Sequence, residues 1–172
     1  MTIVNPDHLF DQAEGLVQLS AAGPPRQADL RRAISTAYYG LFHATLRATA
    51  DLFVGASNRN STNYALVYRS VDHKRLRDFC EDVLKQTMPK KYSTYVPRNG
   101  FGPNIAAFAA AFIELQNKRV DADYNPLYRT KKSNARLLVR TGRAAAVRFK
   151  KASSIRRRAF LTLLVFPPRP QQ

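Results

Sequence analysis

Polar side chains that could bind or act on phosphate groups are crowded near the end of one apolar segment. In the stretch ELQNKRVDADYNP, which runs from Glu114 to Pro126, Arg119 is followed by Asp123 and Tyr124 just before a proline. An arginine can clamp a phosphate through its fork of N–H donors and stabilise the charge that develops on it. A tyrosine hydroxyl can donate a hydrogen bond or a proton. These residue types raise the question of whether the segment carries chemistry or only ends a solvated helix.

The position of Arg119 on its helix argues against a simple solvated end. The segment before it carries an inward apolar stripe at helical spacing, formed by Ile105, Phe108, Phe112 and Leu115. At about 100° per residue the same stripe continues through Arg119, Ala122 and Asp123, where packing alone would favour leucine. A charge in such a place must be paired, line a cleft or lie at a subunit interface. We therefore expect Arg119 to be at least half buried, with a carboxylate such as Asp123 or a subunit interface beside it.

A surface ion pair is the competing interpretation of the same residues. Arg119 and Asp123 are four residues apart, and an exposed pair at this spacing stabilises a helix by only about 0.3–0.5 kcal/mol. This interpretation gives no role to Tyr124 or to the second aspartate, Asp121.

The positive charge of the chain is concentrated towards its C-terminal end. Of the 28 Lys and Arg residues, 13 lie in residues 129–172, which contain none of the 12 Asp and Glu residues. A segment this basic is typical of a nucleic-acid contact or of a surface for an acidic partner. Within it, Arg136, Arg140 and Arg143 are predicted to share a helix face and to hold phosphates.

The elements that must position these residues are predicted to be helices, because apolar residues recur at helical spacing and strand-type alternation is scarce. We expect an all-α bundle of five or six helices over residues 5–20, 27–54, 64–86, 103–124 and 131–152, with a final apolar segment before the tail PPRPQQ. Residues 87–103 should form a long extended connection. Residues 1–152 are predicted to form the bundle, and residues 153–172 a basic and apolar C-terminal helix and tail.

Other features of the sequence narrow the class of protein. No run of apolar residues is long enough to span a membrane, and the acidic N-terminus lacks the layout of a secretory signal. Cys80 is the single cysteine, so no internal disulfide can form, and a reducing cytoplasm is the simplest location. The spacing of the histidines shows no metal site, and we expect neither a metal nor a cofactor. A Ser or Cys nucleophile motif and a glycine-rich phosphate loop are also absent.

Two motifs together resemble the HEPN family of small helical proteins. They are RRAISTAYYGLFHATL at Arg31–Leu46, with an AYYxxFH pattern, and NKRVDADYNP at Asn117–Pro126, with an RxxADY pattern. The resemblance covers roughly residues 27–152 and implies a small helical bundle, often dimeric, with the polar motif near the dimer seam. Many members are metal-independent endoribonucleases, typically toxins paired with a nucleotidyltransferase-type antitoxin. RNA, such an antitoxin and a second copy of the chain are therefore the expected partners.

The catalytic pattern of that family is incomplete in this chain. It consists of an arginine, four to six residues and a histidine, and at those positions Arg119 is followed by Tyr124, Asn125 and Pro126. RNA cleavage by a 2′-hydroxyl needs a base and an acid, roles that histidine fills near neutral pH and tyrosine fills poorly. The motif therefore supports binding better than cleavage. Of the histidines, His43 fits a structural position inside the bundle, as does His73.

The leading hypothesis is a HEPN-like protein that binds RNA or a nucleotide-bearing partner, as one half of a toxin–antitoxin-type system, with ribonuclease activity weak or lost. Its site is expected to combine Arg119, Asp123 and Tyr124 with residues that face them across the bundle: Arg31, Arg32, Tyr38, Tyr39 and His43.

Two alternatives stay open. In the first, the chain is an active metal-independent endoribonuclease toxin that uses Arg119 with Tyr124 or His43. In the second, it is a non-enzymatic interaction protein whose basic C-terminal segment docks on an acidic protein or a membrane surface. The run Ala159–Phe166, which is apolar and follows three arginines, supports this second alternative.

Overall fold

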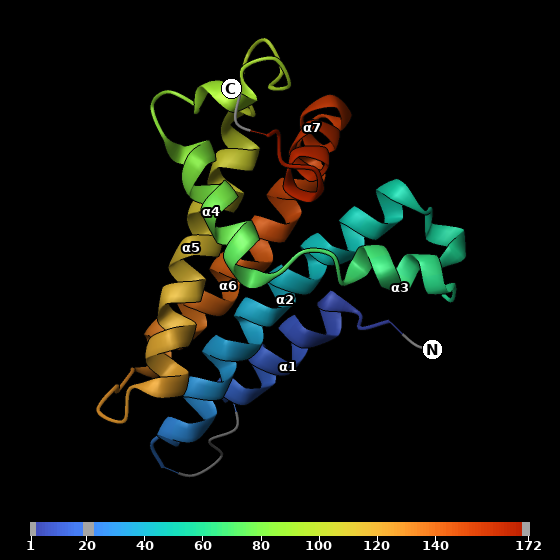
Figure 1. Ribbon diagram of the computed structural model, residues 1–172. Coiled ribbons are helices and arrows are strands. Elements are labelled where there is room, and N and C mark those ends of the chain that lie inside the picture. The colour runs from blue at the N-terminus through green and yellow to red at the C-terminus, as the bar shows by residue number, and fades with distance from the viewer. Residues whose placement is uncertain (1–2, 19–22, 170–172) are drawn as a thin grey trace. The chain divides into compact units, whose positions relative to one another are not determined.

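The computed structural model describes residues 3–18 and 23–169, and every regular element within these ranges is a helix (Figure 1). Seven α-helices follow one another along this part of the chain: α1 (Pro6–Gln18), α2 (Gln27–Phe53), α3 (Thr62–Tyr68), α4 (His73–Leu84), α5 (Gly102–Tyr124), α6 (Lys132–Lys151) and α7 (Ser154–Val165). Two single-turn 3-10 helices, Ala56–Asn58 and Lys90–Tyr92, lie in the connections. The all-α prediction is confirmed, although the number of α-helices in the described ranges exceeds the five or six expected.

The additional helix comes from the segment predicted as one helix over residues 64–86. This segment forms α3 and α4, which residues 69–72 separate. The side chain of Asp72 accepts a hydrogen bond from the backbone N–H of Arg75 and so caps the start of α4. Ser61 caps the start of α3 in the same way. The prediction of a single helix was wrong because apolar residues keep their helical spacing on both sides of residues 69–72. The break between the two helices is marked by Asp72, the residue that caps α4.

The other predicted boundaries agree with the structure within a few residues. The helices predicted over 27–54, 103–124 and 131–152 are α2, α5 and α6. The helix predicted over 5–20 is α1, whose described part ends at Gln18, and residues 19–20 lie outside the described ranges. The last three residues of the predicted tail also lie outside them. The connection over 87–103 contains the 3-10 turn Lys90–Tyr92.

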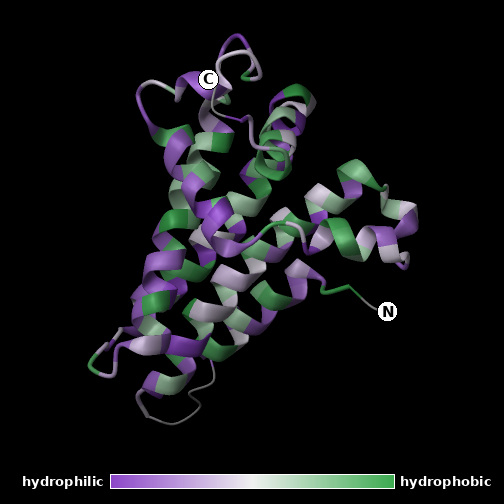
Figure 2. Ribbon diagram, in the orientation of Figure 1, coloured by the Kyte–Doolittle hydropathy of each residue, from purple (hydrophilic) through white to green (hydrophobic). Residues whose placement is uncertain are grey.

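The chain forms two compact units. In the described part, unit 1 comprises residue 3, residues 45–110 and residues 147–169, and unit 2 comprises residues 4–18, 23–44 and 111–146. Each of the helices α2, α5 and α6 contributes one part to each unit. Figure 2 shows hydrophobic and hydrophilic residues alternating along these helices, the pattern expected of helices that turn one side to a core.

Unit 2 is packed around the first part of α2. Its core residues there are Leu30, Ile34, Tyr38 and Leu41, all buried. The helix α1 contributes Phe10, whose ring lies against Gly40 of α2 and Gly142 of α6. A Cβ atom added at either glycine would lie 3.0 Å from that ring. The missing side chains therefore allow the close approach of Phe10 on which the packing of α1 depends.

Unit 1 has an aromatic core to which α7 contributes its central residue. Phe160 of α7 is fully buried. Its ring centroid lies 5.0 Å from that of Phe79 in α4, 5.7 Å from that of Phe108 in α5 and 5.6 Å from that of Phe149 in α6. Because the four rings come from four helices, this cluster fixes α7 against the rest of unit 1.

Candidate functional site

Arg119 lies in the last part of α5, and its side chain is 19% exposed. Its Nε atom lies 2.8 Å from Oδ2 of Asp123, one helical turn further along. Nε is buried and its N–H finds no aligned acceptor among the described residues, so this contact is an ion pair without a hydrogen bond. Ser35 of α2 donates its hydroxyl proton to the other carboxylate oxygen of Asp123. The prediction of a half-buried arginine beside Asp123 is confirmed.

Three tyrosine rings surround the guanidinium group of Arg119. Its central carbon lies 5.8, 5.5 and 5.4 Å from the ring centroids of Tyr38, Tyr39 and Tyr124. Nη2 donates to the hydroxyl of Tyr39 over 2.9 Å and, at the limit of a hydrogen bond, to that of Tyr124 over 3.5 Å. Tyr38 is buried in the core, whereas Tyr124 is 69% exposed. One ring of the cluster is therefore open to a ligand.

The charge of the cluster is balanced within it. Burial acts to lower the pKa of Arg119, but Tyr39, Asp123 and Tyr124 outweigh burial and raise that pKa, so the guanidinium stays charged. Asp123 compensates this charge at 2.8 Å. The site therefore has little excess positive charge with which to hold an isolated phosphate. What it offers is an exposed ring, backed by a guanidinium whose Nη1 atom donates to no described residue.

Arg31 fixes the end of the helix that carries the site. Its Nε donates to the carbonyl oxygen of Ala122 over 2.6 Å, and its Nη2 donates to that of Asn125 over 3.0 Å. These carbonyls belong to the C-terminal end of α5, where backbone acceptors lack helical partners. The predicted binding residue Arg31 thus acts as a cap in the structure. Its neighbour Arg32 is exposed.

The three arginines that were expected to hold phosphates together differ in their surroundings. Arg143 is tied to α1, because its Nη2 lies 2.7 Å from Asp11 and its Nε lies 3.0 Å from Glu14. Arg136 and Arg140 are exposed on α6 and line a small hollow of about 140 Å³ beside the end of α1. Of the three arginines, Arg136 and Arg140 remain available for a polyanion, because Arg143 already has two carboxylate partners.

His43 lies one turn beyond Tyr39 on α2 and is half buried. Its ring centroid is 6.4 Å from that of Tyr39 and 5.8 Å from that of Phe42. Tyr39 in turn accepts a hydrogen bond from Arg119, so His43 stands next to the cluster. His73 begins α4 in unit 1 and does not belong to this cluster.

Sequence reasoning selected Arg119, Asp123, Tyr124, Tyr38 and Tyr39, which the structure brings together. It missed Ser35, which is buried and holds the carboxylate of Asp123 in place. The available signal was a small polar residue within the otherwise apolar face of α2.

Other reactive groups offer no second site of the same kind. Burial raises the pKa of the Cys80 thiol far above its ordinary value, so this cysteine is a poor nucleophile. Among the described residues, no cluster of three or more His, Cys, Asp or Glu side chains could hold a metal ion. In the same part of the chain, no helix combines the length and apolar character needed to cross a membrane.

No model of a protein family, no curated protein and no solved structure matches the chain. The resemblance to the HEPN family therefore stays a prediction that rests on the two motifs. What the site does has to be argued from its own contacts.

Proposed function

We propose that unit 2 binds single-stranded RNA, with the ring of Tyr124 stacking on a base and Arg119 donating to a neighbouring phosphate or base edge. The observation that carries this proposal is a tyrosine that is 69% exposed, yet held against a guanidinium with an unused amino group. Stacking of a base on an aromatic side chain contributes about 1–3 kcal/mol, and single strands are recognised mainly in this way.

The surrounding surface supports attraction of a polyanion. The Lys and Arg residues exposed in unit 2 are Arg26, which pairs with Asp29, and Arg32, Arg129, Lys131, Arg136 and Arg140. Charges of this kind attract phosphates over a distance set by the ionic strength and contribute affinity that does not depend on sequence. The aromatic site then supplies the short-range contact that the balanced Arg119–Asp123 pair could not supply by charge alone.

Binding is favoured over cleavage because Tyr124 occupies the position where a histidine acid or base is needed. An endoribonuclease is the second candidate, and the specific observation in its favour is His43, whose ring lies 6.4 Å from that of Tyr39. A second copy of the chain and a nucleotidyltransferase-type antitoxin belong to the proposal through the family resemblance.

Tyr124→Ala is expected to weaken the binding of a fluorescent single-stranded RNA of about 12 nucleotides by about tenfold or more, because the stacking surface is lost. Tyr124→Phe keeps the ring and should stay within about threefold of wild type. Fluorescence anisotropy measures all affinities. The matched control is Tyr95→Ala in unit 1, which removes another exposed tyrosine, 58% exposed. Equal effects of Tyr124→Ala and Tyr95→Ala would contradict the proposal.

Salt dependence tests the role of the basic surface separately. The double variant Arg136→Gln/Arg140→Gln should reduce the slope of log affinity against log salt by about 1.4, since each phosphate contact to a single strand contributes about 0.7. Arg98→Gln removes an exposed arginine of unit 1 and serves as control. An unchanged slope in the double variant would assign Arg136 and Arg140 to ordinary solvated surface.

A further inference from the structure

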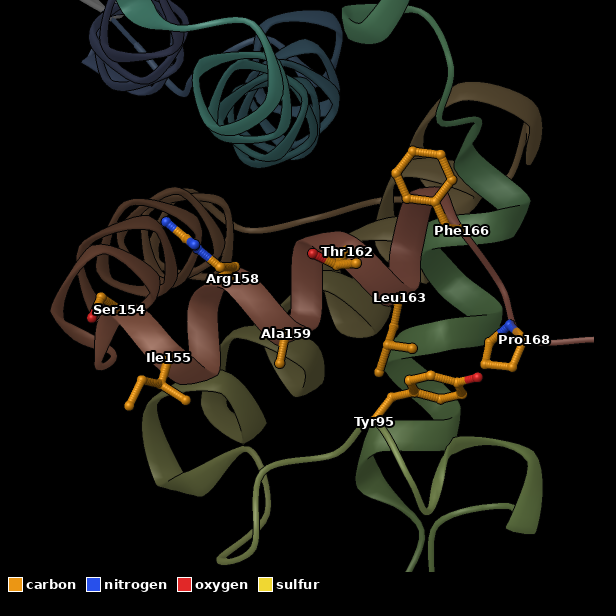
Figure 3. Close-up of a pocket in the computed structure, with 9 residues that line it drawn as sticks. All are labelled: Tyr95, Ser154, Ile155, Arg158, Ala159, Thr162, Leu163, Phe166 and Pro168. Atoms are coloured by element: carbon orange, nitrogen blue, oxygen red, sulfur yellow. The ribbon is translucent and has the colours of Figure 1, made fainter.

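The outer side of α7 in unit 1 forms an open hollow of about 720 Å³ that plays no part in the RNA site (Figure 3). Three large apolar side chains in its lining are mostly exposed: Ile155 at 72%, Phe166 at 60% and Tyr95 at 58%. Arg158, Thr162 and Phe166 follow one another along one side of the helix, and Ile155 projects from another side (Figure 3). Exposed apolar groups gathered in one hollow are typical of a binding surface.

The walls of this hollow are held rigidly. The hydroxyl of Ser153 caps the start of α7. At the other end, Arg75 of α4 donates to the carbonyl oxygens of Leu163 and Leu164 over 2.5 and 3.0 Å. Between these ends, the buried Phe160 anchors the helix in the aromatic core. A surface that is ordered before binding loses little conformational entropy when a partner arrives.

The charge around the hollow is positive and uncompensated. Arg156 donates to the carbonyl oxygen of Asn99, and Arg157 donates to that of Lys150, so both engage backbone groups rather than acids. Arg158, which lines the hollow, has no ion-pair partner among the described residues. Residues 129–172 contain no Asp or Glu at all. A complementary occupant is therefore apolar on one side and negatively charged beside it.

We propose that the hollow docks an acidic amphipathic helix of a partner protein. Ile155 and Phe166 are 11 residues apart, which corresponds to about 16 Å along α7 and to about three turns of a helix lying against it. Such a helix inserts apolar side chains at spacings of three and four residues and places acidic residues towards Arg158. This docking function is independent of the proposed RNA binding, because all of its residues belong to unit 1.

Other occupants fit the hollow less well. A small ligand is normally enclosed over most of its surface, whereas here the lining residues Ile155, Tyr95 and Phe166 are themselves mostly exposed. A helix that lies on a membrane turns its broad apolar side to the lipid. The broad apolar side of α7, with Phe160, Leu161 and Leu164, is instead buried in unit 1.

The test is a binding titration with the full chain. The probes are a panel of fluorescein-labelled peptides of about 14 residues, with Leu, Ile, Phe or Met at the apolar positions of a helix and Glu, Gln or Ala elsewhere. At least one of them should bind saturably in the micromolar range. Ile155→Ser and Arg158→Glu should each weaken that binding at least about tenfold. Ile155 is 72% exposed and Arg158 also lies at an exposed position, so circular dichroism should show an unchanged helical content.

Matched controls separate docking in the hollow from non-specific binding to exposed apolar or charged side chains. Leu66→Ser removes another exposed apolar side chain of unit 1, 71% exposed, and Arg98→Glu reverses another exposed charge. Both should change peptide affinity less than about twofold, and peptides of scrambled order should not bind. The proposal is overturned if no peptide of the panel binds saturably, or if the α7 variants bind as well as the controls. It is also overturned if anionic phosphatidylglycerol vesicles bind the wild type through Ile155 while the peptides do not.

Discussion

Arg119→Ala is expected to weaken RNA binding at least about tenfold and to lower the free energy of unfolding by about 1–3 kcal/mol. The substitution leaves the carboxylate of Asp123 without the guanidinium that lies 2.8 Å away, and it withdraws a hydrogen-bond donor from Tyr39. A fully buried pair would cost more when broken. Here the side chains of Arg119 and Asp123 are 19% and 27% exposed, so water compensates part of the loss.

Two further variants separate the structural role of Arg119 from its contact with RNA. Arg119→Lys keeps a positive charge near Asp123 but lacks the planar fork of donors, so it should recover most of the stability and little of the affinity. Arg98→Ala, at an exposed position in unit 1, controls for the loss of one arginine. Urea unfolding followed by circular dichroism measures stability. An Arg119→Ala protein with wild-type affinity and stability would rule out this cluster as a site.

The same set of proteins separates binding from cleavage. We expect wild type to cleave a broad RNA pool no faster than a mock purification, because Tyr124 stands where the family pattern has a histidine. Arg119→Ala should then disturb RNA binding, folding or dimerisation instead of turnover. Robust cleavage that resists EDTA and vanishes in Tyr124→Phe would make the site catalytic. Cleavage that vanishes in His43→Asn would place the acid or base on α2.

The burial of Arg119 could be predicted because it depends on one helix alone. On α5 the apolar stripe through Phe108, Phe112 and Leu115 determines which later residues point inward, whatever packs against them. The direction of a side chain around its own helix follows from the helical period. The ends of α2 and α5 were also predicted closely, from the prolines and glycines that flank them.

The partners of the arginines could not be predicted, because they come from distant parts of the chain. Arg31 donates to Ala122, which is 91 residues away, and Arg143 pairs with Asp11, which is 132 residues away. Nothing in the local pattern distinguishes these arginines from Arg136 or Arg140, which stay exposed. The sequence thus indicates how many arginines lie on one face of a helix. Which of these arginines remain free to bind is decided by the packing of distant segments.

Which side of α7 faces outward could not be predicted from the sequence either. The run from Ala159 to Phe166 is apolar nearly throughout, so its periodicity does not separate a buried side from an exposed one. The aromatic rings that decide the matter, Phe79 and Phe108, belong to α4 and α5. Because these rings hold the Phe160 side of α7 in the core, Ile155 on another side of the helix faces solvent.

Phe160→Ala is expected to lower the free energy of unfolding by about 3–5 kcal/mol, a large share of the stability of an ordinary domain. The ring is fully buried, and its removal leaves a cavity between Phe79, Phe108 and Phe149 that four helices would have to close. Because packed helices relax only partly around such a cavity, most of the lost contact energy is not recovered.

Phe166→Ala is the matched control for this substitution. It removes the same side chain from the end of α7, but Phe166 is 60% exposed and packs edge-on against Phe53. Its loss should lower the free energy of unfolding, measured in urea, by less than about 1 kcal/mol. The same substitution should still weaken peptide binding in the hollow. If Phe160→Ala cost no more than Phe166→Ala, α7 would not be anchored in the core of unit 1. The docking surface would then lack the rigid wall on which its proposed affinity for an acidic helix depends.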